Sequence, residues 1–365
     1  MSIERPAWVE RFLDRPRTRH GHFDALDGLR GLAVLIVIAS HMSLLGLGIV
    51  PGVSFGGIGK SGVYLFFVLS AFLLTRLLVE RAPAGFADAR LWMAYALRRV
   101  LRIWPLYLTV LAASWAATAA GVAAWPYPLD AARVLRHLAL REGESVLWSI
   151  PVEFKFYAWL PLVAVGIAWM LQRGWKPLAQ LAVLAVLLAL AALAWPPAAT
   201  GVNDVRLGPY LALFLCGAFA AGLDRALQAP RHRAAWGAAG AVGLLAIAAT
   251  MPPAWAALTG AAFDQRLNHQ WFVFFGLAWA TVLLAVLRGP DWLRRPFCSV
   301  PLRLAGVVSF SAYLWHLPVM AAMRWLGIAD WPGGGWWTLL AIAVAAMASY
   351  LAIERPWRDV RLSAA

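Results

Sequence analysis

Long apolar stretches alternate along the whole chain with short segments that contain charged residues, proline or glycine. A helix needs about 20 apolar residues to cross a hydrocarbon core about 30 Å thick, and several stretches reach that length. The pattern therefore predicts an all-α, polytopic integral membrane protein with about ten transmembrane helices. The expected ranges are 29–49, 62–79, 103–123, 147–171, 178–195, 209–223, 236–251, 270–287, 304–326 and 336–353.

The overall composition agrees with a membrane environment. Of the 365 residues, 62% are hydrophobic and 14% are charged, whereas about a quarter of a soluble domain is charged. The net charge of +14 does not indicate nucleic-acid binding, because no basic run alternates with aromatic residues on a polar face. The two cysteines, Cys216 and Cys298, lack the spacing of a disulfide framework or a zinc site, so no metal and no structural disulfide are predicted.

The distribution of lysine and arginine predicts how the helices are oriented. With a cytoplasmic N-terminus, 24 of the 32 basic residues fall in cytoplasmic segments and seven fall outside. The positive-inside rule then favours an even number of helices with both termini in the cytoplasm. We expect a cytoplasmic tail at 1–25, a membrane domain at 26–357 and a second tail at 358–365. The first apolar run is too long for a cleaved signal peptide, so it is expected to remain as a helix.

Ionisable residues within apolar segments are the first candidates for function, because each costs a few kcal/mol in a membrane. His41 follows Arg30 by eleven residues, which places it about 16 Å into the hydrocarbon core, near its midplane. The alternative role is a core histidine bonded to a backbone carbonyl.

Arg98, Arg99 and Arg102 lie before the third expected span, and Arg99 and Arg102 share a helical face because they are three residues apart. They either anchor the helix at the cytoplasmic surface or bind the phosphates of an anionic donor.

A third group lies at the start of the fourth expected span, in SVLWSIPVEFKFYAWLPL. Ser149, Glu153 and Tyr157 are four residues apart and line one helical face, with Lys155 on another. Glu153 either caps the helix, orients a histidine or binds an acceptor hydroxyl.

Two further ionisable residues lie near the C-terminus, His316 in SAYLWHLPV and Glu354 in IERPW. His316 either bonds a buried carbonyl or takes part in chemistry, and Glu354 either pairs with a neighbouring arginine or has a functional role.

Six motifs, taken in chain order, resemble the acyltransferase-3 family, the membrane-bound O-acyltransferases of the O-antigen acetylase and nodulation-protein type. They are LDGLRGLAVLIVIASH, GVYLFFVLSAFLLTRLL, RRVLRIWPLYL, LWSIPVEFKFY, SAYLWHLPV and IERPW. Together they span residues 26 to 357, which makes the resemblance specific. The chain is similar to the stand-alone form of the family, without an added hydrolase-like domain.

The resemblance implies roles for particular residues. His41 matches the catalytic histidine, Arg30 its companion, and Arg99 and Arg102 the RxxR pair that serves the donor, while Glu153 matches the acid of the fourth helix.

Two departures from the family pattern bear on acceptor specificity. Ala71 stands where a glycine is common, and Phe154-Lys155 replaces the commoner Glu-Gln.

The resemblance also implies an activity. We expect transfer of an acyl group, acetyl first, from cytoplasmic acyl-CoA to a hydroxyl of a cell-surface glycan, a lipid-linked sugar or another glycosylated acceptor. His41 would act as general base, or would carry an acyl-histidine intermediate. The enzyme would lie among lipids in the bacterial inner membrane, use acyl-CoA as co-substrate and hold no permanent cofactor. The acceptor, the pathway and the oligomeric state are left open.

A transporter or flippase for a glycolipid or small solute is the alternative, because carriers also contain intramembrane His, Arg and Glu. The duplicated halves typical of carriers are not visible in the sequence, and labelled acetyl-CoA would distinguish the two activities.

Overall fold

The computed structural model describes residues 12–13, 22–50, 52–81, 85–227, 232–264 and 266–358. This part of the chain is mostly helical and contains no strand, so the predicted all-α class is confirmed. The expected tails lie largely outside the described residues. The α-helices are α2 His22–Leu44, α3 Gly59–Arg81, α4 Ala89–Ala119, α5 Ala131–Leu138, α6 Ser149–Gln172, α7 Pro177–Ala194, α8 Leu211–Ala226, α9 Arg233–Ala249, α10 Pro252–Thr259, α11 Arg266–Gln270, α12 Phe272–Arg288, α13 Asp291–Arg294, α14 Val300–Val307, α15 Ser309–Trp325, α16 Gly334–Ser349 and α17 Arg355–Arg358.

Short helical turns lie between these helices. The 3₁₀ turns are η2 Ser145–Trp148, η3 Pro197–Ala199, η4 Gly208–Tyr210, η5 Arg295–Cys298 and η6 Ile328–Asp330, and η7 Tyr350–Glu354 is a π-helical turn.

Six helices in the described ranges are long and apolar enough to cross a membrane, and nine spans result if each of three bent helix pairs counts as one. The prediction of a multi-pass membrane protein is therefore confirmed. Helix α8 covers most of the expected range 209–223. With 16 residues it is too short to count among the six spans. The count of ten spans and the position of the termini stay predictions.

Two expected boundaries differ from the structure. Helix α4 begins at Ala89 rather than near 103, because the Asp88 side chain caps it by accepting a hydrogen bond from the Arg90 amide. The range 304–326 is not one straight helix, since α14 and α15 meet at Val308 with a bend of 79°. Apolar periodicity locates the membrane segment but does not report a cap or a bend inside it.

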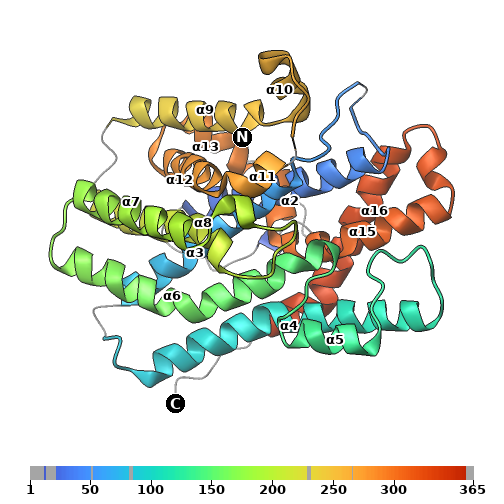
Figure 1. Ribbon diagram of the computed structural model, residues 1–365, viewed down its shortest axis with the longest axis horizontal. Coiled ribbons are helices and arrows are strands. Elements are labelled where there is room, and N and C mark those ends of the chain that lie inside the picture. Colours follow the sequence, from blue (N-terminus) through green and yellow to red (C-terminus); the bar gives the residue numbers. More distant parts are fainter. Residues whose placement is uncertain are drawn as a thin grey trace, which may run out of the picture.

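Helices α2 and α3 form the centre of the molecule (Figure 1). Helices α6, α7 and α8 lie on one side of them, α15 and α16 on the other, α9 and α10 above, and α4 along the lower edge. Helix α2 packs closely against α14 and η5 through glycines. A Cβ at Gly28 would collide with the carbonyl oxygen of Phe297, and one at Gly306 with that of Asp27. These contacts fix α2 in place.

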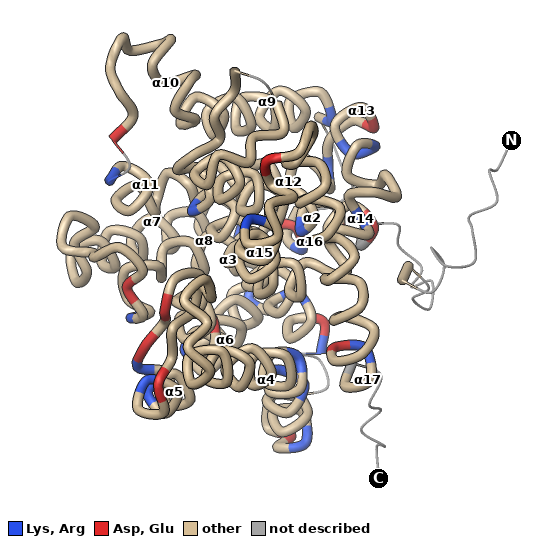
Figure 2. Tube along the Cα trace, turned by 90° about the vertical axis from the view of Figure 1, so that its right-hand side faces the viewer, with Lys and Arg blue, Asp and Glu red and all other residues tan. Residues whose placement is uncertain are grey.

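The outward surface is that of a membrane protein. Large apolar side chains are exposed along the outer helices, for example Leu193 on α7 at 77% and Leu245 on α9 at 69%. Charged residues gather near α5, α13 and α17 and along α4 (Figure 2), whereas α7, α9 and α10 are largely free of charge.

Candidate functional site

Two cavities lie between the central helices and adjoin each other. The first, which we name the arginine cavity, has a volume of about 100 Å³ and is lined by Arg30, Arg99 and Arg102. The second, the histidine cavity, has a volume of about 180 Å³ and is lined by His41. Val63 and Tyr313 line both cavities, so the residues between the two volumes come from α3 and α15.

Tyr313 lies between the two cavities, and its hydroxyl is held in place by two hydrogen bonds. It donates a hydrogen bond to the Val146 carbonyl oxygen at 2.7 Å and accepts one from Ser149 Oγ at 3.0 Å. Val146 faces the histidine cavity and Ser149 the arginine cavity. The two volumes are thus separated by side chains rather than by a helix.

The two α4 arginines that line the arginine cavity, Arg99 and Arg102, differ in their partners. Arg102 Nη1 forms an ion pair of 2.6 Å with Glu354 Oε2, whose side chain is only 2% exposed. The other carboxylate oxygen of Glu354 accepts hydrogen bonds from the amide of Ser311 at 3.0 Å and from its hydroxyl at 2.5 Å. The arginine partner that the sequence suggested for Glu354 is therefore Arg102, from a helix 252 residues away along the chain.

Arg99 lacks such a carboxylate partner in the contacts of the described residues. Its guanidinium carbon lies 5.8 Å from the centre of the Tyr157 ring, and its buried Nε has no hydrogen-bond partner. Of the two, Arg99 is therefore the arginine that lines the cavity without a carboxylate partner among the described residues.

Glu153 belongs to the arginine cavity. Its Oε1 accepts hydrogen bonds from Ser70 Oγ at 2.5 Å and from the Tyr157 hydroxyl at 2.6 Å. Among the described residues it forms no hydrogen bond with a histidine, and it lines the same cavity as Ser149 and Tyr157. The carboxylate lies beside the arginines rather than against His41.

His41 and His316 form a hydrogen-bonded pair. His316 is fully buried, its Nδ1 lies 2.7 Å from the Tyr313 carbonyl oxygen, and its Nε2 lies 3.0 Å from His41 Nδ1. A carbonyl only accepts, so Nδ1 of His316 carries the proton and Nε2 of the neutral ring accepts from His41 Nδ1–H. This network leaves the lone pair of His41 on Nε2.

The remainder of the histidine cavity is polar. Lys60 Nζ, at the start of α3, donates to Asn203 Oδ1 at 2.6 Å and lies 3.8 Å from the centre of the Trp148 ring. Asn268 and His269 of α11 complete this side. Burial, and to a smaller extent the nearby Lys60, lowers the pKa of His269 to about 4, so this imidazole is neutral at pH 7.

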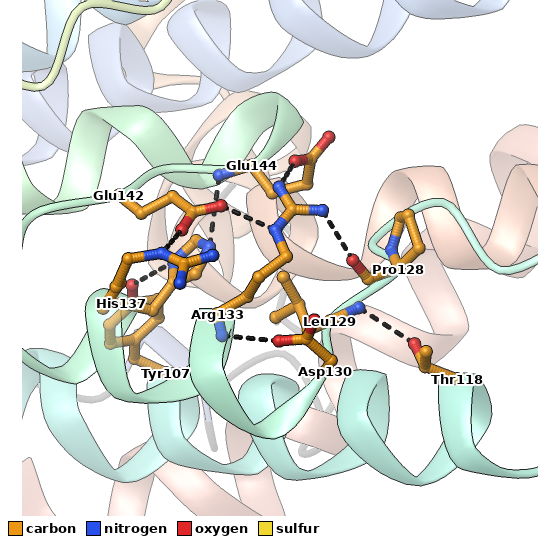
Figure 3. Close-up of polar contacts among 10 residues, drawn as sticks. Tyr107, Thr118, Pro128, Leu129, Asp130, Arg133, His137, Glu142 and Glu144 are labelled. Atoms are coloured by element: carbon orange, nitrogen blue, oxygen red, sulfur yellow. Dashed lines mark hydrogen bonds and ion pairs between the residues drawn. The ribbon is translucent and has the colours of Figure 1, made fainter.

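Residues of η2 line the histidine cavity. The segment that leads into η2 is held by an ion-pair cluster (Figure 3). Arg133 binds both Glu142, at 2.6 Å, and Glu144, which directly precedes η2. The buried His137 accepts from the Glu144 amide at 3.3 Å and contacts the Tyr107 hydroxyl at 2.9 Å. Burial lowers the pKa of His137 to about 4, which keeps the ring neutral and able to accept.

Sequence reasoning did not single out several residues of these cavities. Ser70 and Tyr313 stand inside motifs that we quoted for other reasons, Lys60 precedes the second of these motifs, and Asn203 and His269 come from connecting segments. Lys60, an isolated lysine just before an apolar run, is the one residue of this set that the sequence pattern could have marked as a candidate. The described ranges contain no group of three or more His, Cys, Asp or Glu side chains arranged to hold a metal ion.

Comparisons with known proteins identify the family of the chain. The family model for the acyltransferase domain matches residues 23–355. BcsY of Komagataeibacter xylinus, a protein named as a membrane-bound transacylase, is 27% identical over 360 residues, covering 92% of this chain and 82% of BcsY. No solved structure matches the chain. Because the match extends over almost the whole sequence, this chain belongs to the acyltransferase-3 family and is a membrane-bound acyltransferase.

Proposed function

We propose that this acyltransferase moves an acyl group, acetyl first, from acyl-CoA bound at the arginine cavity to a hydroxyl of a sugar acceptor entering the histidine cavity. The acceptor is a cell-surface glycan, a lipid-linked sugar or another glycosylated molecule. Family membership favours this enzyme over a transporter or flippase.

The observation that carries the proposal is the meeting of two chemically different cavities at Tyr313 and Val63. Guanidinium groups suit the phosphates of a CoA donor, and Arg99 lines the cavity without a carboxylate partner among the described residues. A base beside the second cavity suits an acceptor hydroxyl. The thioester would reach the boundary from one side and the hydroxyl from the other.

The histidine pair supports a base role for His41. Nε2 of His41 would take the proton of the acceptor hydroxyl as its oxygen attacks the thioester carbonyl, and the CoA sulfur would leave and take up that proton. His316 would hold the tautomer through the 3.0 Å hydrogen bond and strengthen this bond as His41 gains charge. His316 thus acts as a positioning residue.

The same geometry also permits an acyl-histidine, in which Nε2 attacks the thioester and then passes the acyl group to the hydroxyl. The two routes differ in kinetics. A covalent route releases CoA thiol before the acceptor binds, whereas direct transfer requires both substrates first.

Glu153 supports donor binding in this proposal. Its carboxylate lines the same cavity as the arginines and accepts from Ser70 and Tyr157, so it would orient the guanidinium of Arg99 or accept an amide N–H of the pantetheine arm. Glu153→Gln should lower turnover more than Lys155→Gln, because Lys155 Nζ donates to the Val205 carbonyl at 2.7 Å outside this cavity. Equal losses at equal expression would contradict this role.

We place the enzyme in the bacterial inner membrane, with both termini in the cytoplasm. This orientation brings acyl-CoA to the arginines from the cytoplasm and follows the positive-inside rule. In a background without Cys216 and Cys298, a cysteine introduced at Asp130 should react with an impermeant reagent from outside, and one at Arg294 should not. The opposite labelling would reverse the orientation.

The test of the whole proposal is transfer of label. Membranes that contain the protein are incubated with radiolabelled acetyl-CoA, and the glycan and lipid fractions are counted. Label should appear in one of them with the wild type and fall to background with His41→Ala. Mass spectrometry of the labelled fraction then identifies the acceptor. Label that is equal in membranes with and without the protein would overturn the proposal.

A further inference from the structure

Lys60 places a partly buried amine in the wall of the histidine cavity, with no negatively charged partner among the described residues. Its two contacts, the Asn203 side-chain oxygen at 2.6 Å and the Trp148 ring at 3.8 Å, are both neutral. Lys60 is also the second residue of α3, where the positive end of the helix dipole adds to its charge. The amine therefore has no carboxylate to favour its protonated form in the part of the protein that the structure describes, and a bound anion would supply this counter-charge.

The rest of the cavity does not supply a carboxylate. Apart from Lys60, its polar lining consists of hydroxyl, amide and imidazole groups, from Ser40, His41, Ser145, Asn203, Asn268, His269 and Tyr313. Carboxylates on the adjoining loops are each paired with an arginine of their own, in the pairs Asp204–Arg206, Glu144–Arg133 and Asp264–Arg266. The cavity consequently offers hydrogen bonds and one lysine to whatever enters it.

The backbone around the cavity gives an independent indication of a binding site. Ser145 and Asn203 both have positive φ, at 48° and 59°, and only four non-glycine residues in the described ranges do. Such conformations cost free energy and persist mainly where the surroundings hold them for a function. Here Lys60 holds Asn203, and the ion-pair cluster of Arg133 precedes Ser145.

We infer that the histidine cavity binds an acceptor that carries a negative charge, a carboxylate or a phosphate, with Lys60 as its counter-ion and with the hydroxyl to be acylated facing His41. This inference rests on the proposed sugar acylation and names its substrate class. Asn203 and His269 would accept or donate hydrogen bonds to the remaining hydroxyls of the sugar.

The competing explanation is that Lys60 only anchors the loop that contains Asn203. The chain offers a matched control, because Lys155 anchors the same loop through the Val205 carbonyl at 2.7 Å and does not line the cavity. Lys60→Gln removes the charge from the cavity, whereas Lys155→Gln removes a charge and a loop contact outside it. Lys60→Arg keeps the charge.

The experiment measures binding of three matched sugars to purified protein in nanodiscs by saturation-transfer NMR. The probes are methyl β-D-glucuronide, methyl β-D-glucoside 6-phosphate and methyl β-D-glucoside, which differ in the charged group. Unlabelled CoA is present throughout to occupy the arginine cavity. The two anionic probes distinguish a carboxylate from a phosphate as the preferred anion.

The wild type should bind at least one anionic probe about tenfold or more tightly than the neutral one, as expected for a charge-assisted contact. Lys60→Gln should abolish this preference by weakening the anionic probe alone, while Lys155→Gln and Lys60→Arg retain it. Equal binding of all three sugars by the wild type, or the same loss in Lys60→Gln and Lys155→Gln, would overturn the inference.

Acyl transfer to the same sugars is measured in parallel with labelled acetyl-CoA. A preference that depends on Lys60 without any transfer would support the anion site and contradict sugar acylation. Transfer to the neutral and anionic sugars at equal rates, with no effect of Lys60→Gln, would support sugar acylation and contradict the anion site.

Discussion

Replacement of His316 should slow acyl transfer without weakening donor binding. The 3.0 Å hydrogen bond between His316 Nε2 and His41 Nδ1 fixes which nitrogen of His41 bears the lone pair. The bond strengthens as His41 takes up a proton, so its loss affects the transition state more than the ground state. A charge-assisted hydrogen bond contributes about 1.5–3 kcal/mol, and about 1.4 kcal/mol corresponds to a factor of ten. His316→Ala should therefore lower kcat about 10- to 150-fold.

Two further variants make the comparison specific. His41→Ala removes the base itself and should lower kcat about 10²-fold or more. The double variant should be no slower than His41→Ala alone, because the two histidines act as one unit. His316→Gln should recover part of the rate, since its amide oxygen can accept from His41 Nδ1–H near the position of Nε2.

The assay follows release of CoA thiol and transfer of label from acetyl-CoA by purified protein in nanodiscs, with donor affinity measured separately by titration. Donor affinity should stay within about twofold of the wild type in every histidine variant, because the arginine cavity is unchanged. Wild-type kcat in His316→Ala, or a double variant much slower than His41→Ala, would refute the hydrogen-bonded base.

Three other predictions test the surroundings of this pair. Arg99→Ala should weaken acyl-CoA binding about tenfold or more, because this arginine lines the cavity without a carboxylate partner among the described residues. Titration at two salt concentrations checks this, and unchanged affinity would contradict the donor site. Arg102→Ala should cost up to about 3 kcal/mol of stability, because it leaves the buried Glu354 unpaired. Adding Glu354→Gln should restore most of the lost melting temperature, and a double variant less stable than Arg102→Ala would contradict the Arg102–Glu354 ion pair. Burial lowers the pKa of His137 from 6.5 to about 4, so the folded protein favours the neutral ring and stability should fall as pH drops from 6.5 to 4. The melting temperature of His137→Gln should depend less steeply on pH in this range, and an unchanged slope would contradict a neutral, buried His137.

Much of the fold could be predicted from the sequence because membrane burial imposes a simple pattern. Apolar stretches of sufficient length located the main spans, because polar side chains on a lipid-exposed helix face are costly in the hydrocarbon core. The length of α4 and the bend between α14 and α15 were not predicted. They depend on the Asp88 cap and on packing against α2, which are properties of single residues and of distant contacts.

The site was only partly accessible to sequence reasoning. Periodicity could place Ser149, Glu153 and Tyr157 on one face, because they share a helix. It could not bring His316 to His41, which is 275 residues away, or Arg102 to Glu354. The π-helical turn η7 contains Glu354 and contributes to that contact, and no residue pattern announces such a turn.

The rigid seating of α2 has a consequence for the choice of donor. Arg30 and His41 stand on one helix, eleven residues or about 16 Å apart along its axis, and the glycine contact of Gly28 with η5 prevents the helix from sliding. Under the proposed mechanism, α2 therefore fixes the distance between the site that binds the phosphates and the base, and the pantetheine arm of the donor has to match this distance. Donor selectivity would then depend more on the distance between the phosphates and the thioester than on the structure of the acyl chain. Short thioesters that lack the nucleotide end would be poor donors even when their acyl group is correct.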